Sequence, residues 1–384
     1  MKYRKLGRTN IKVSEIALGC EGFSGKSPEE TKDMLGYAYN KGINFIDLYS
    51  SNPEMRSNLG IAIKELGIRE NFVIEAHIGS TWRNGQYERS RNLEANKMAF
   101  DDLLERLQTD YIDVGMIHYV DAEDDYKRVF DTEIIEYIKS LKEEGKIKSI
   151  GISSHNPIIA KKAAETGLID VILFSINPCY DMQPASEDCN DLWDSNNYKN
   201  IEFKIDKDRE DFYEYCEKEN IAITVMKCYG GGDLLDSELS PFKVALTTSQ
   251  CISYCLTRPG VASVMLGTKT NAEIDEALKY EIANKEERDY GEILGKLPRN
   301  NMDGKCVYCG HCAPCTVEID IASVNKYTAL VKAEKEVPET VREHYKNLKH
   351  HASECIKCGR CESNCPFHVE IIKKMEEAVQ IFGY

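Results

Sequence analysis

The chain of 384 residues is long enough for about two to three domains, and its composition, 42% hydrophobic and 29% charged, is that of a globular protein. A net charge of −15 argues against nucleic acid as a partner, because polyphosphate binding relies on basic patches that release counterions. The first residues lack the apolar run of a signal peptide, and no stretch approaches the roughly 20 apolar residues of a membrane span. We therefore expect a cytoplasmic protein that binds neither nucleic acid nor a membrane.

Short apolar runs alternate with amphipathic segments along most of the chain. The runs, each predicted to be a strand, cover residues 13–19, 45–49, 72–78, 111–119, 149–154, 171–176, 222–228 and 263–268. The helical patterns cover residues 27–42, 53–67, 94–108, 133–146, 157–167, 208–219 and 272–281. This α/β alternation is typical of a parallel (β/α)8 TIM barrel, whose function gathers at the C-terminal ends of the strands. A doubly wound sheet is the alternative, but the G-x-G-x-x-G turn that it often carries is missing.

Eight of the fifteen cysteines fall into two runs near the end of the chain. The first run is Cys306, Cys309, Cys312 and Cys315, and the second is Cys355, Cys358, Cys361 and Cys365. The second has the C-x2-C-x2-C-x3-C-P spacing of bacterial ferredoxins, in which three thiolates bind one [4Fe-4S] cluster and the fourth binds the other. We therefore expect Cys365 to complete the cluster of the first run, and Cys315 to complete the cluster of the second. Structural zinc is the alternative, since C-x2-C pairs also bind Zn²⁺.

The first run departs from this pattern, because two residues rather than three separate Cys312 from Cys315, and Thr316 follows Cys315 in place of proline. The insert between the runs, residues 326–354, is longer than a minimal ferredoxin needs, and could seat the cluster module on the barrel or bind a partner. We predict a barrel over residues 1–290, followed by a small α+β ferredoxin-like iron–sulfur domain with added helices over residues 291–384. Without an export signal, so many cysteines indicate reduced thiols and metal ligands.

Segments spread over the predicted barrel resemble the aldo-keto reductases. They read KYRKLGRTNIKVSEIALG, NFIDLY, DYIDVGMIHYVD, GKIKSIGISSHN and RPGVASVMLGT, and they extend from the first residue to about residue 285. The chain is similar to the subgroup in which this barrel is fused to a C-terminal two-cluster ferredoxin module. The resemblance implies reduction of a carbonyl by NAD(P)H at the barrel mouth, within a tetrad of aspartate, tyrosine, lysine and histidine.

Two of the four catalytic positions that the resemblance implies are changed. Asp47 matches the aspartate and His118 the histidine, but the tyrosine falls on Asn52 and the lysine on His77. An asparagine amide can hydrogen-bond to a developing alkoxide but is a poor proton donor. We expect His77 with His118 to act as the acid, since the nearby carboxylate of Asp47 favours a charged imidazole. Tyr49, on the same inward face as Asp47, offers another phenol, with core filling as an equal alternative.

The nicotinamide site that the resemblance implies is also altered. Of the residues that would hold the carboxamide and the ring, Ser153 is retained, whereas Ser154, Leu173 and Met226 take the other places. We therefore expect NAD(P)H to lack its usual pose.

The phosphate region is retained in part. After the eighth strand the chain keeps Gly267, Thr268 and Lys269, but Glu273 replaces an arginine and should repel a 2′-phosphate. After the seventh strand, Lys227 and the glycines Gly230, Gly231 and Gly232 are suited to a phosphate, since barrels commonly bind one there. A merely flexible turn is the alternative for the glycines.

The electron count bears on the cofactor. A [4Fe-4S] cluster transfers one electron at a time, whereas reduction of a carbonyl or enoyl group needs two. We therefore predict an oxidoreductase in which a flavin such as FMN couples the clusters to a small organic carbonyl or enoyl substrate, in either direction. One alternative retains NAD(P)H, with the clusters exchanging electrons with ferredoxin or another redox partner. The other alternative is a non-catalytic electron carrier or interaction protein.

Two segments are expected to border the active site. The loop over residues 177–206 is unusually long, and it could cover a bound ring with Tyr180, Met182 and Trp193. The segment after the third strand could bind a carboxylate substrate through its arginines, which are Arg83, Arg89 and Arg91. Surface charge is the alternative for each of them.

Overall fold

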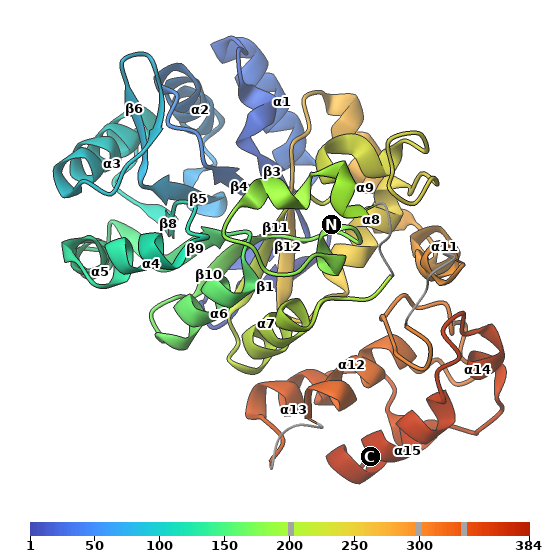
Figure 1. The fold of residues 1–384 in the computed structure, drawn as a ribbon. Coiled ribbons are helices and arrows are strands. Elements are labelled where there is room, and N and C mark those ends of the chain that lie inside the picture. The colour runs from blue at the N-terminus through green and yellow to red at the C-terminus, as the bar shows by residue number, and fades with distance from the viewer. Residues whose placement is uncertain (199–202, 297–301, 332–335) are drawn as a thin grey trace.

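The computed structural model describes residues 1–198, 203–296, 302–331 and 336–384, with a closed barrel of parallel strands at its centre (Figure 1). In chain order the strands are β3 (Ile16–Gly19), β4 (Phe45–Leu48), β5 (Val73–Ile78), β8 (Ile112–Ile117), β9 (Ile147–Ser154), β10 (Val171–Ser175), β11 (Ala222–Met226) and β12 (Val261–Leu266). Strand β12 pairs with β3 and closes the barrel. The TIM-barrel prediction is confirmed, and each of the apolar runs overlaps one of these strands.

The remaining strands form two antiparallel hairpins. β1 (Tyr3–Lys5) pairs with β2 (Lys12–Ser14) and packs against β12 at the N-terminal end of the barrel. β6 (Ser80–Arg83) pairs with β7 (Gln86–Arg89) and follows β5 at the opposite end. The second hairpin turns at Asn84 and Gly85, which both have positive φ, as a two-residue hairpin turn requires. It therefore stands at the barrel mouth, where function is expected.

Helices surround the barrel. Those that the sequence predicted are α1 (Pro28–Asn40), α2 (Pro53–Leu66), α3 (Leu93–Leu107), α5 (Glu133–Glu143), α6 (Pro157–Glu165), α7 (Lys207–Lys218) and α9 (Asn271–Ile282). The structure adds α4 (Glu123–Phe130), α8 (Thr248–Leu256) and α10 (Lys285–Arg288). Helix α8 escaped prediction because seven of its nine residues are buried, so its sequence lacks an amphipathic repeat. None of the described helices is long and apolar enough to cross a membrane.

Two apolar cores fill the molecule. The barrel interior is packed with Leu6, Val13, Ala17, Phe45, Val73, Val114, Met116, Val171, Leu173, Ala222, Ala262 and Met265. A larger core lies between the barrel and its helices and continues into the C-terminal part of the chain. The barrel and the C-terminal part are therefore joined by a shared apolar core.

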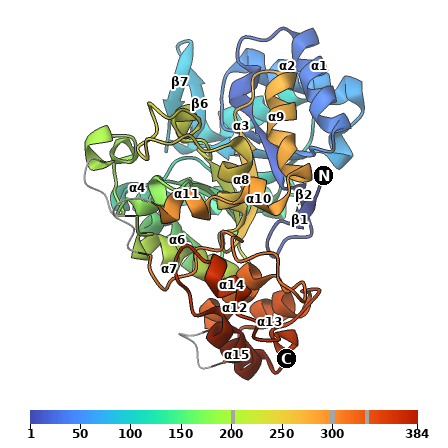
Figure 2. The ribbon, with the colours of Figure 1, turned by 90° about the vertical axis from the view of Figure 1, so that its right-hand side faces the viewer.

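Residues 302–331 and 336–384, here called the cluster module, lie on the flank of the barrel and leave its mouth uncovered (Figures 1 and 2). Helix α11 (Gly291–Gly295) precedes the module, whose helices are α12 (Ile321–Val331), α13 (Glu339–Lys346), α14 (Arg360–Asn364) and α15 (Ile371–Phe382). Helix α13 packs against α7, and His344 Nδ1 lies 2.7 Å from Glu217 Oε1 between them. The insert between the cysteine runs, of which 332–335 lie outside the described residues, thus has the seating role that was one of its two expected roles.

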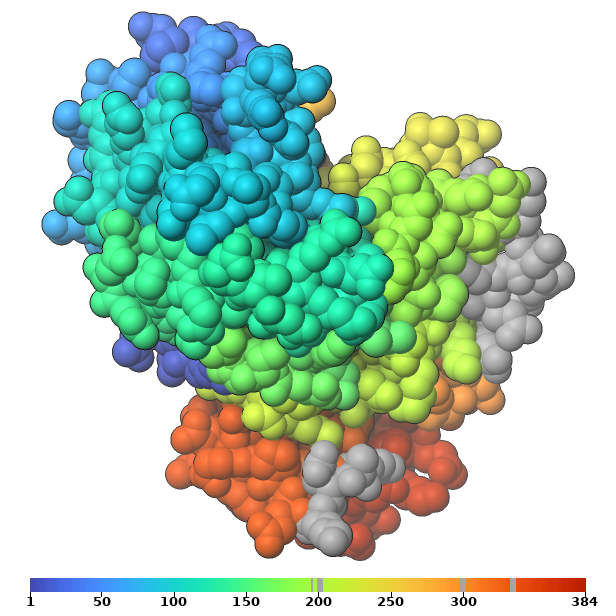
Figure 3. Space-filling model, turned by 60° about the vertical axis from the view of Figure 1, so that its left-hand side comes forward, coloured from blue at the N-terminus to red at the C-terminus, as the bar shows by residue number. Residues whose placement is uncertain are grey.

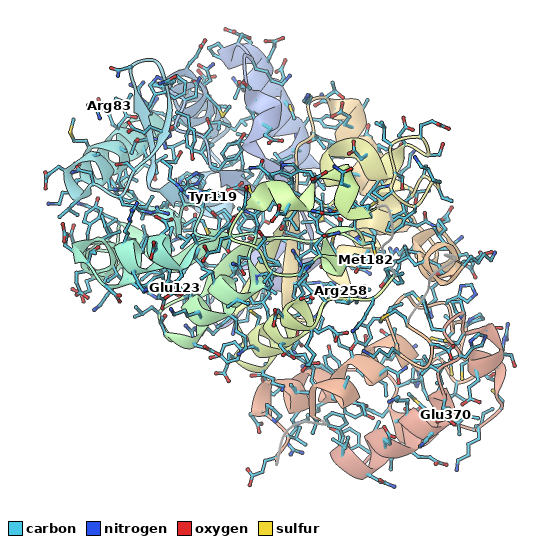
Figure 4. All side chains as sticks on the ribbon, viewed as in Figure 1. Arg83, Tyr119, Glu123, Met182, Arg258 and Glu370 are labelled. Carbon is cyan, nitrogen blue, oxygen red and sulfur yellow. The ribbon has the colours of Figure 1, made fainter. Side chains whose placement is uncertain are left out.

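A buried polar network crosses the seam between the barrel and the module. Arg258, at the barrel edge that faces the module (Figure 4), is 2% exposed and donates to the carbonyl of Val307. Its guanidinium lies 4.5 Å from the ring centre of Tyr254, which is on α8. The Tyr254 hydroxyl donates to Asp181 Oδ2 at 2.7 Å. The first cysteine run, α8 and the loop over residues 177–206 therefore share one network.

Candidate functional site

A cavity of about 720 Å³ opens at the C-terminal ends of the barrel strands. Figure 3 shows the molecule hollowed between the cyan β6–β7 region and the green to yellow loops that follow β10 and β11. On the side of β4, β5 and β8 the lining includes Asp47, Tyr49, His77, Tyr87, His118 and Tyr119. On the side of β11 and β12 it includes Met226, Lys227, Gly231, Gly232, Gly267 and Lys269.

Four of these side chains form a continuous hydrogen-bonded chain, which we call the relay: Asp47, His77, His118 and Tyr87. Asp47 Oδ1 lies 2.9 Å from His77 Nε2, and His77 Nδ1 lies 2.7 Å from His118 Nδ1. The Tyr87 hydroxyl lies 2.7 Å from His118 Nε2. All three distances are those of hydrogen bonds, so both ring nitrogens of each histidine are engaged within the relay.

The barrel register explains why the relay forms. Asp47 pairs with Glu75 across β4 and β5, and His77, two residues farther along β5, points to the same inward face one layer higher. His77 pairs with Met116 on β8, so His118, two residues later, also faces inward. The contact between Asp47 and His77 is the one that neighbouring strands led us to expect.

Sequence reasoning missed Tyr87, because the segment after the third strand read as a polar loop. The signal that could have found it is the pair Asn84 and Gly85, which favours a tight hairpin over a loop. That hairpin sets Tyr87 opposite Trp82. The Tyr87 ring also meets His118 edge to face, with 5.6 Å between ring centres.

Burial fixes the protonation of His118. It lowers the pKa of His118 well below the ordinary value of 6.5, and nearby His77, Arg91 and Arg89 lower this pKa further. His118 is therefore neutral at pH 7, with one ring nitrogen that donates and one that accepts. A neutral imidazole between two partners can pass a proton in either direction.

Glu75 lies beneath the relay in the barrel interior and is fully buried. Both of its carboxyl oxygens lie 3.4 Å from Thr224 Oγ1. Burial raises the pKa of Glu75 well above its ordinary value, and the charge of Asp47 raises it further. The folded chain therefore holds a neutral carboxyl group next to Asp47.

Replacing Glu75 with glutamine is expected to stabilise the chain at high pH and to change little at low pH. Folding raises the pKa of Glu75 above its ordinary value of 4.5. The wild-type protein therefore loses stability as the pH rises above 4.5 toward the pKa that Glu75 has in the folded state. Glutamine has the same shape and no charge to bury. Thermal unfolding is measured from about pH 5 to about pH 9. The free energy of unfolding of Glu75→Gln should exceed that of wild type by an amount that grows by up to about 1.4 kcal/mol per pH unit.

The matched control is Glu29→Gln, which changes an exposed glutamate and should leave the pH dependence of wild type intact. Parallel stability curves for wild type and Glu75→Gln would contradict the expectation.

The other two predicted catalytic residues are placed differently from each other. Tyr49 lines the cavity, with its hydroxyl 3.5 Å from Glu21 Oε1, and burial raises the pKa of Tyr49, helped by Cys20 and Glu21. Asn52 is the N-cap of α2, where its Oδ1 accepts the backbone N–H of Met55 at 3.0 Å. Asn52 is thus engaged with the helix terminus and does not line the cavity.

The predicted cofactor-binding residues also divide. Those that line the cavity are Ser153, Lys227, Gly231, Gly267 and Lys269, and those that do not are Ser154, Gly230 and Thr268. Ser154 turns away from the cavity and donates to Asp121 Oδ1 at 2.9 Å. Glu273, expected to repel a 2′-phosphate, lines the phosphate side and accepts the backbone N–H of Lys269 at 2.7 Å.

Of the three residues of the long loop that were predicted to cover a bound ring, only Trp193 lies at the border of the cavity. Its short 3₁₀ helices are η3 (Tyr180–Met182), η4 (Cys189–Leu192) and η5 (Ser195–Tyr198), and residues 199–202 lie outside the described residues. Trp193 lies 6.1 Å from the ring of His155 and 5.8 Å from Lys227 Nζ, both of which line the cavity. Tyr180 and Met182 are buried and are not part of the lining.

The arginines after β5 hold the site together from outside the cavity. Arg91 donates to Asp125 Oδ2 at 2.6 Å and to the carbonyl of His118 at 2.7 Å. Arg89 donates to the carbonyl of Tyr119 at 3.0 Å and lies over its ring. Arg83, far from Tyr119 in Figure 4, is exposed. Arg89 and Arg91 therefore fix the end of β8, and with it His118.

The module gathers the cysteines of the two runs into two groups. One small cavity is lined by Cys306, Cys309, Cys312 and Cys365, and another by Cys315, Cys355, Cys358 and Cys361. The groups exchange Cys315 and Cys365 between the runs, which is the partition that the ferredoxin spacing predicts.

The two groups repeat the same backbone. Tyr308 and Gly310 flank Cys309 with positive φ, and Lys357 and Gly359 flank Cys358 in the same way. Cys315 lies in the second group even though no proline follows it.

The donor set of each group fits a [4Fe-4S] cluster. Each group offers four thiols, and N–H groups approach the sulfurs, with Asn325 Nδ2 3.5 Å from Cys306 Sγ and the N–H of Lys357 3.4 Å from Cys355 Sγ. Gly291, at the start of α11, permits that helix to approach the first group closely, since a Cβ there would lie 2.5 Å from Cys309 Sγ.

The chain belongs to the aldo/keto reductase family, whose model matches residues 15–247. A second model, of the 4Fe-4S dicluster domain, matches residues 305–370 and favours iron over zinc for the two cysteine groups. The chain therefore combines an aldo/keto reductase family domain with a C-terminal 4Fe-4S dicluster domain.

Individual relatives agree with this assignment. The chain is 30% identical over 188 residues to an uncharacterized oxidoreductase of Bacillus subtilis (strain 168), YqkF, covering 48% of this chain and 58% of that protein. It is 32% identical over 161 residues to the aldo-keto reductase YhdN of the same organism, covering 40% and 47%. The chain thus spans about half the length of the curated relatives it matches.

A solved structure shows the same fold. The holo form of an aldo-keto reductase from Bacillus halodurans superposes with a TM-score of 0.60 at 24% identity, covering 75% of this chain and 94% of that chain. At this identity the likeness supports the barrel fold alone.

Proposed function

We propose that the chain reduces the carbonyl or enoyl group of a small organic substrate at the barrel mouth, with two [4Fe-4S] clusters exchanging electrons with that site. The observation that carries the proposal is the relay, in which the buried Asp47, His77 and His118 lead to the exposed Tyr87 at a cavity, together with the two groups of four thiols in the same protein. In this proposal residues 1–290 are the catalytic barrel, residues 291–384 are the cluster domain, ferredoxin or another redox partner meets the module, and the protein acts in the cytoplasm.

We propose a flavin as the cofactor of the barrel. A flavin supplies two-electron chemistry to the substrate and exchanges single electrons with clusters. The cavity supports this choice, because Leu173, Met226 and Met265 give it an apolar surface for a planar ring. Lys227 and Lys269 line the same side and are suited to a phosphate.

NAD(P)H is the second candidate, and Ser153 favours it. Ser153 lines the cavity at the place where the family holds the nicotinamide carboxamide, and its Oγ accepts the backbone N–H of Tyr119 at 2.7 Å. Against this candidate, Ser154 is bonded to Asp121 and Glu273 occupies the phosphate side. The balance of these contacts favours the flavin.

The non-catalytic alternative leaves the relay without a purpose. Asp47, His77 and His118 are all buried, and burying titratable groups is costly unless they are bonded or used. An electron carrier would also have no use for a large cavity at the barrel mouth.

The proposal is tested on full-length protein purified anaerobically. Mass spectrometry of the small molecules released on denaturation should detect a flavin. NAD(H) in its place, with cluster reduction by NADH alone, would support the second candidate.

Turnover is tested with cinnamaldehyde, which carries both a carbonyl and an enoyl group. With NADH or dithionite-reduced methyl viologen as electron donor, chromatography should detect cinnamyl alcohol or hydrocinnamaldehyde, which tells the two reactions apart. Neither product with either donor, from protein with both clusters, would contradict the proposed function.

A further inference from the structure

We propose that Tyr87, from the β6–β7 hairpin, is the proton donor of the reaction, and that His118, His77 and Asp47 return a proton to it. This inference rests on the proposed reduction at the barrel mouth. It assigns a catalytic role to a residue that is not one of the four tetrad positions of the family. Tyr87 would supply the phenol that is lost where Asn52 replaces the tetrad tyrosine.

The contacts of the cavity phenols single out Tyr87. The described phenols on the lining are Tyr49, Tyr87, Tyr119 and Tyr229. The Tyr49 hydroxyl faces Glu21, and the Tyr119 hydroxyl donates to Cys189 Sγ at 3.1 Å. The Tyr229 hydroxyl is buried and has no hydrogen-bond partner among the described residues that could return a proton to it. The Tyr87 hydroxyl bonds instead to an imidazole, His118, which can restore a lost proton. Tyr87 is also 47% exposed, so a substrate in the cavity can reach it.

The relay has two proton arrangements. When both histidines are neutral, His77 donates Nε2–H to Asp47, His118 donates Nδ1–H to His77, and Tyr87 donates its hydroxyl to His118. The phenol proton then points away from the substrate. This is the discharged arrangement.

One added proton reverses the bonds between the rings. His77 then carries hydrogens on both nitrogens beside the Asp47 carboxylate and donates Nδ1–H to His118, which donates Nε2–H to the Tyr87 oxygen. The Tyr87 hydrogen is freed to point into the cavity, and the His118 bond stabilises the phenolate that its loss would create. This is the charged arrangement, and it makes Tyr87 an acid.

One turnover converts the charged arrangement into the discharged one. Reduction adds a hydride to the carbonyl carbon and a proton to its oxygen, so that C=O becomes CH–OH. A bound two-electron cofactor would supply the hydride, and Tyr87 supplies the proton. A proton then passes from His118 to Tyr87 and another from His77 to His118, and solvent recharges the relay.

The surroundings of Tyr87 favour this role over Tyr49. Burial raises the pKa of Tyr87, but Arg89 and Arg91 oppose that rise by stabilising a phenolate. Around Tyr49 the charges have the opposite sign, because Cys20, Glu21 and Asp47 all raise the pKa of Tyr49. Loss of a proton is therefore easier from Tyr87.

The charged groups around the relay give the pH dependence its sign. These charged groups are Glu21, Asp47, Arg89 and Arg91, and the other titratable groups are the neutral carboxyl of Glu75 and His155; they come from η1 (Cys20–Phe23), β4, β5, the end of β7 and the loop after β9. Since catalysis requires the added proton, kcat should fall as pH rises through the apparent pKa of the relay.

The test compares Tyr87→Phe with two variants, with cinnamaldehyde as the substrate and the donor that supports wild-type turnover. Tyr87→Phe keeps the ring against His118, so kcat should fall by about 10²- to 10⁴-fold with little change in KM, and the residual rate should lose the wild-type pH dependence. Tyr49→Phe removes the rival phenol. Trp82→Phe, opposite Tyr87 on the hairpin, should keep wild-type kcat.

The outcomes separate this inference from the proposed function. Wild-type turnover together with a kcat for Tyr87→Phe within about threefold of wild type overturns the role of Tyr87 and leaves the reduction standing. A large loss in Tyr49→Phe alone does the same. No wild-type turnover overturns the reduction and the role of Tyr87 together. Iron content and circular dichroism show whether each variant is folded.

Discussion

Replacing Asp47 with asparagine is expected to lower kcat for cinnamaldehyde by about 10²- to 10⁴-fold and to change KM little. Asp47 is buried, and its contact is with Nε2 of His77 at 2.9 Å. The asparagine oxygen can still accept that N–H, but it carries no charge to hold an added proton on the imidazole. Rates measured from about pH 6 to about pH 9 should show a weaker pH dependence than wild type.

Asp113→Asn is the matched control. Asp113 is also a buried aspartate on a barrel strand, but it pairs with Arg69 and Lys148 and lies away from the cavity. This control should lose stability and keep its kcat. An Asp47→Asn enzyme that works within about threefold of wild type would show that the relay needs no charge at its end.

Removing one thiol is expected to remove one cluster and to spare the other. Wild type should hold about eight irons, and Cys309→Ala about half of them, because each group supplies four thiols to one [4Fe-4S] cluster. Iron analysis together with paramagnetic resonance of the reduced protein measures both the amount and the type of cluster. Zinc in place of iron would contradict the assignment of the module.

Double variants test the exchange between the runs. Cys315→Ala with Cys358→Ala should lose no more iron than either change alone, since both thiols line one cavity. Cys315→Ala with Cys309→Ala should lose both clusters, although these cysteines belong to the same run. The reverse result would show that each run binds its own cluster. Cys216→Ala, a buried cysteine outside both runs, should keep all of the iron.

The barrel could be predicted because its strands are buried on both faces and read as apolar runs. Helix α8 could not, because a helix that is buried all round has no polar face to give it a period. The cysteine groups were predictable for another reason. Their spacing is set by cluster chemistry, and the exchange of Cys315 and Cys365 follows from it.

Only the contacts between residues on barrel strands could be predicted in the candidate site. Asp47 and His77 occupy inward positions on adjacent strands, so their contact follows from the barrel order. Tyr87 reaches His118 through a hairpin whose direction over the mouth depends on tertiary packing, including the bonds that Arg89 and Arg91 make to the end of β8. No spacing in the sequence encodes that direction.

The two cysteine groups of the module share a backbone pattern but have different surroundings. Cys309 lies against Gly291, beside the network of Arg258, whereas its counterpart Cys358 is exposed on the surface. Exposure and nearby charge tune the reduction potential of a cluster, so equivalent halves become unequal by their surroundings alone. One cluster of the module therefore faces the barrel and the other faces solvent. The position of the module on the barrel thus gives electron transfer through the two clusters a direction.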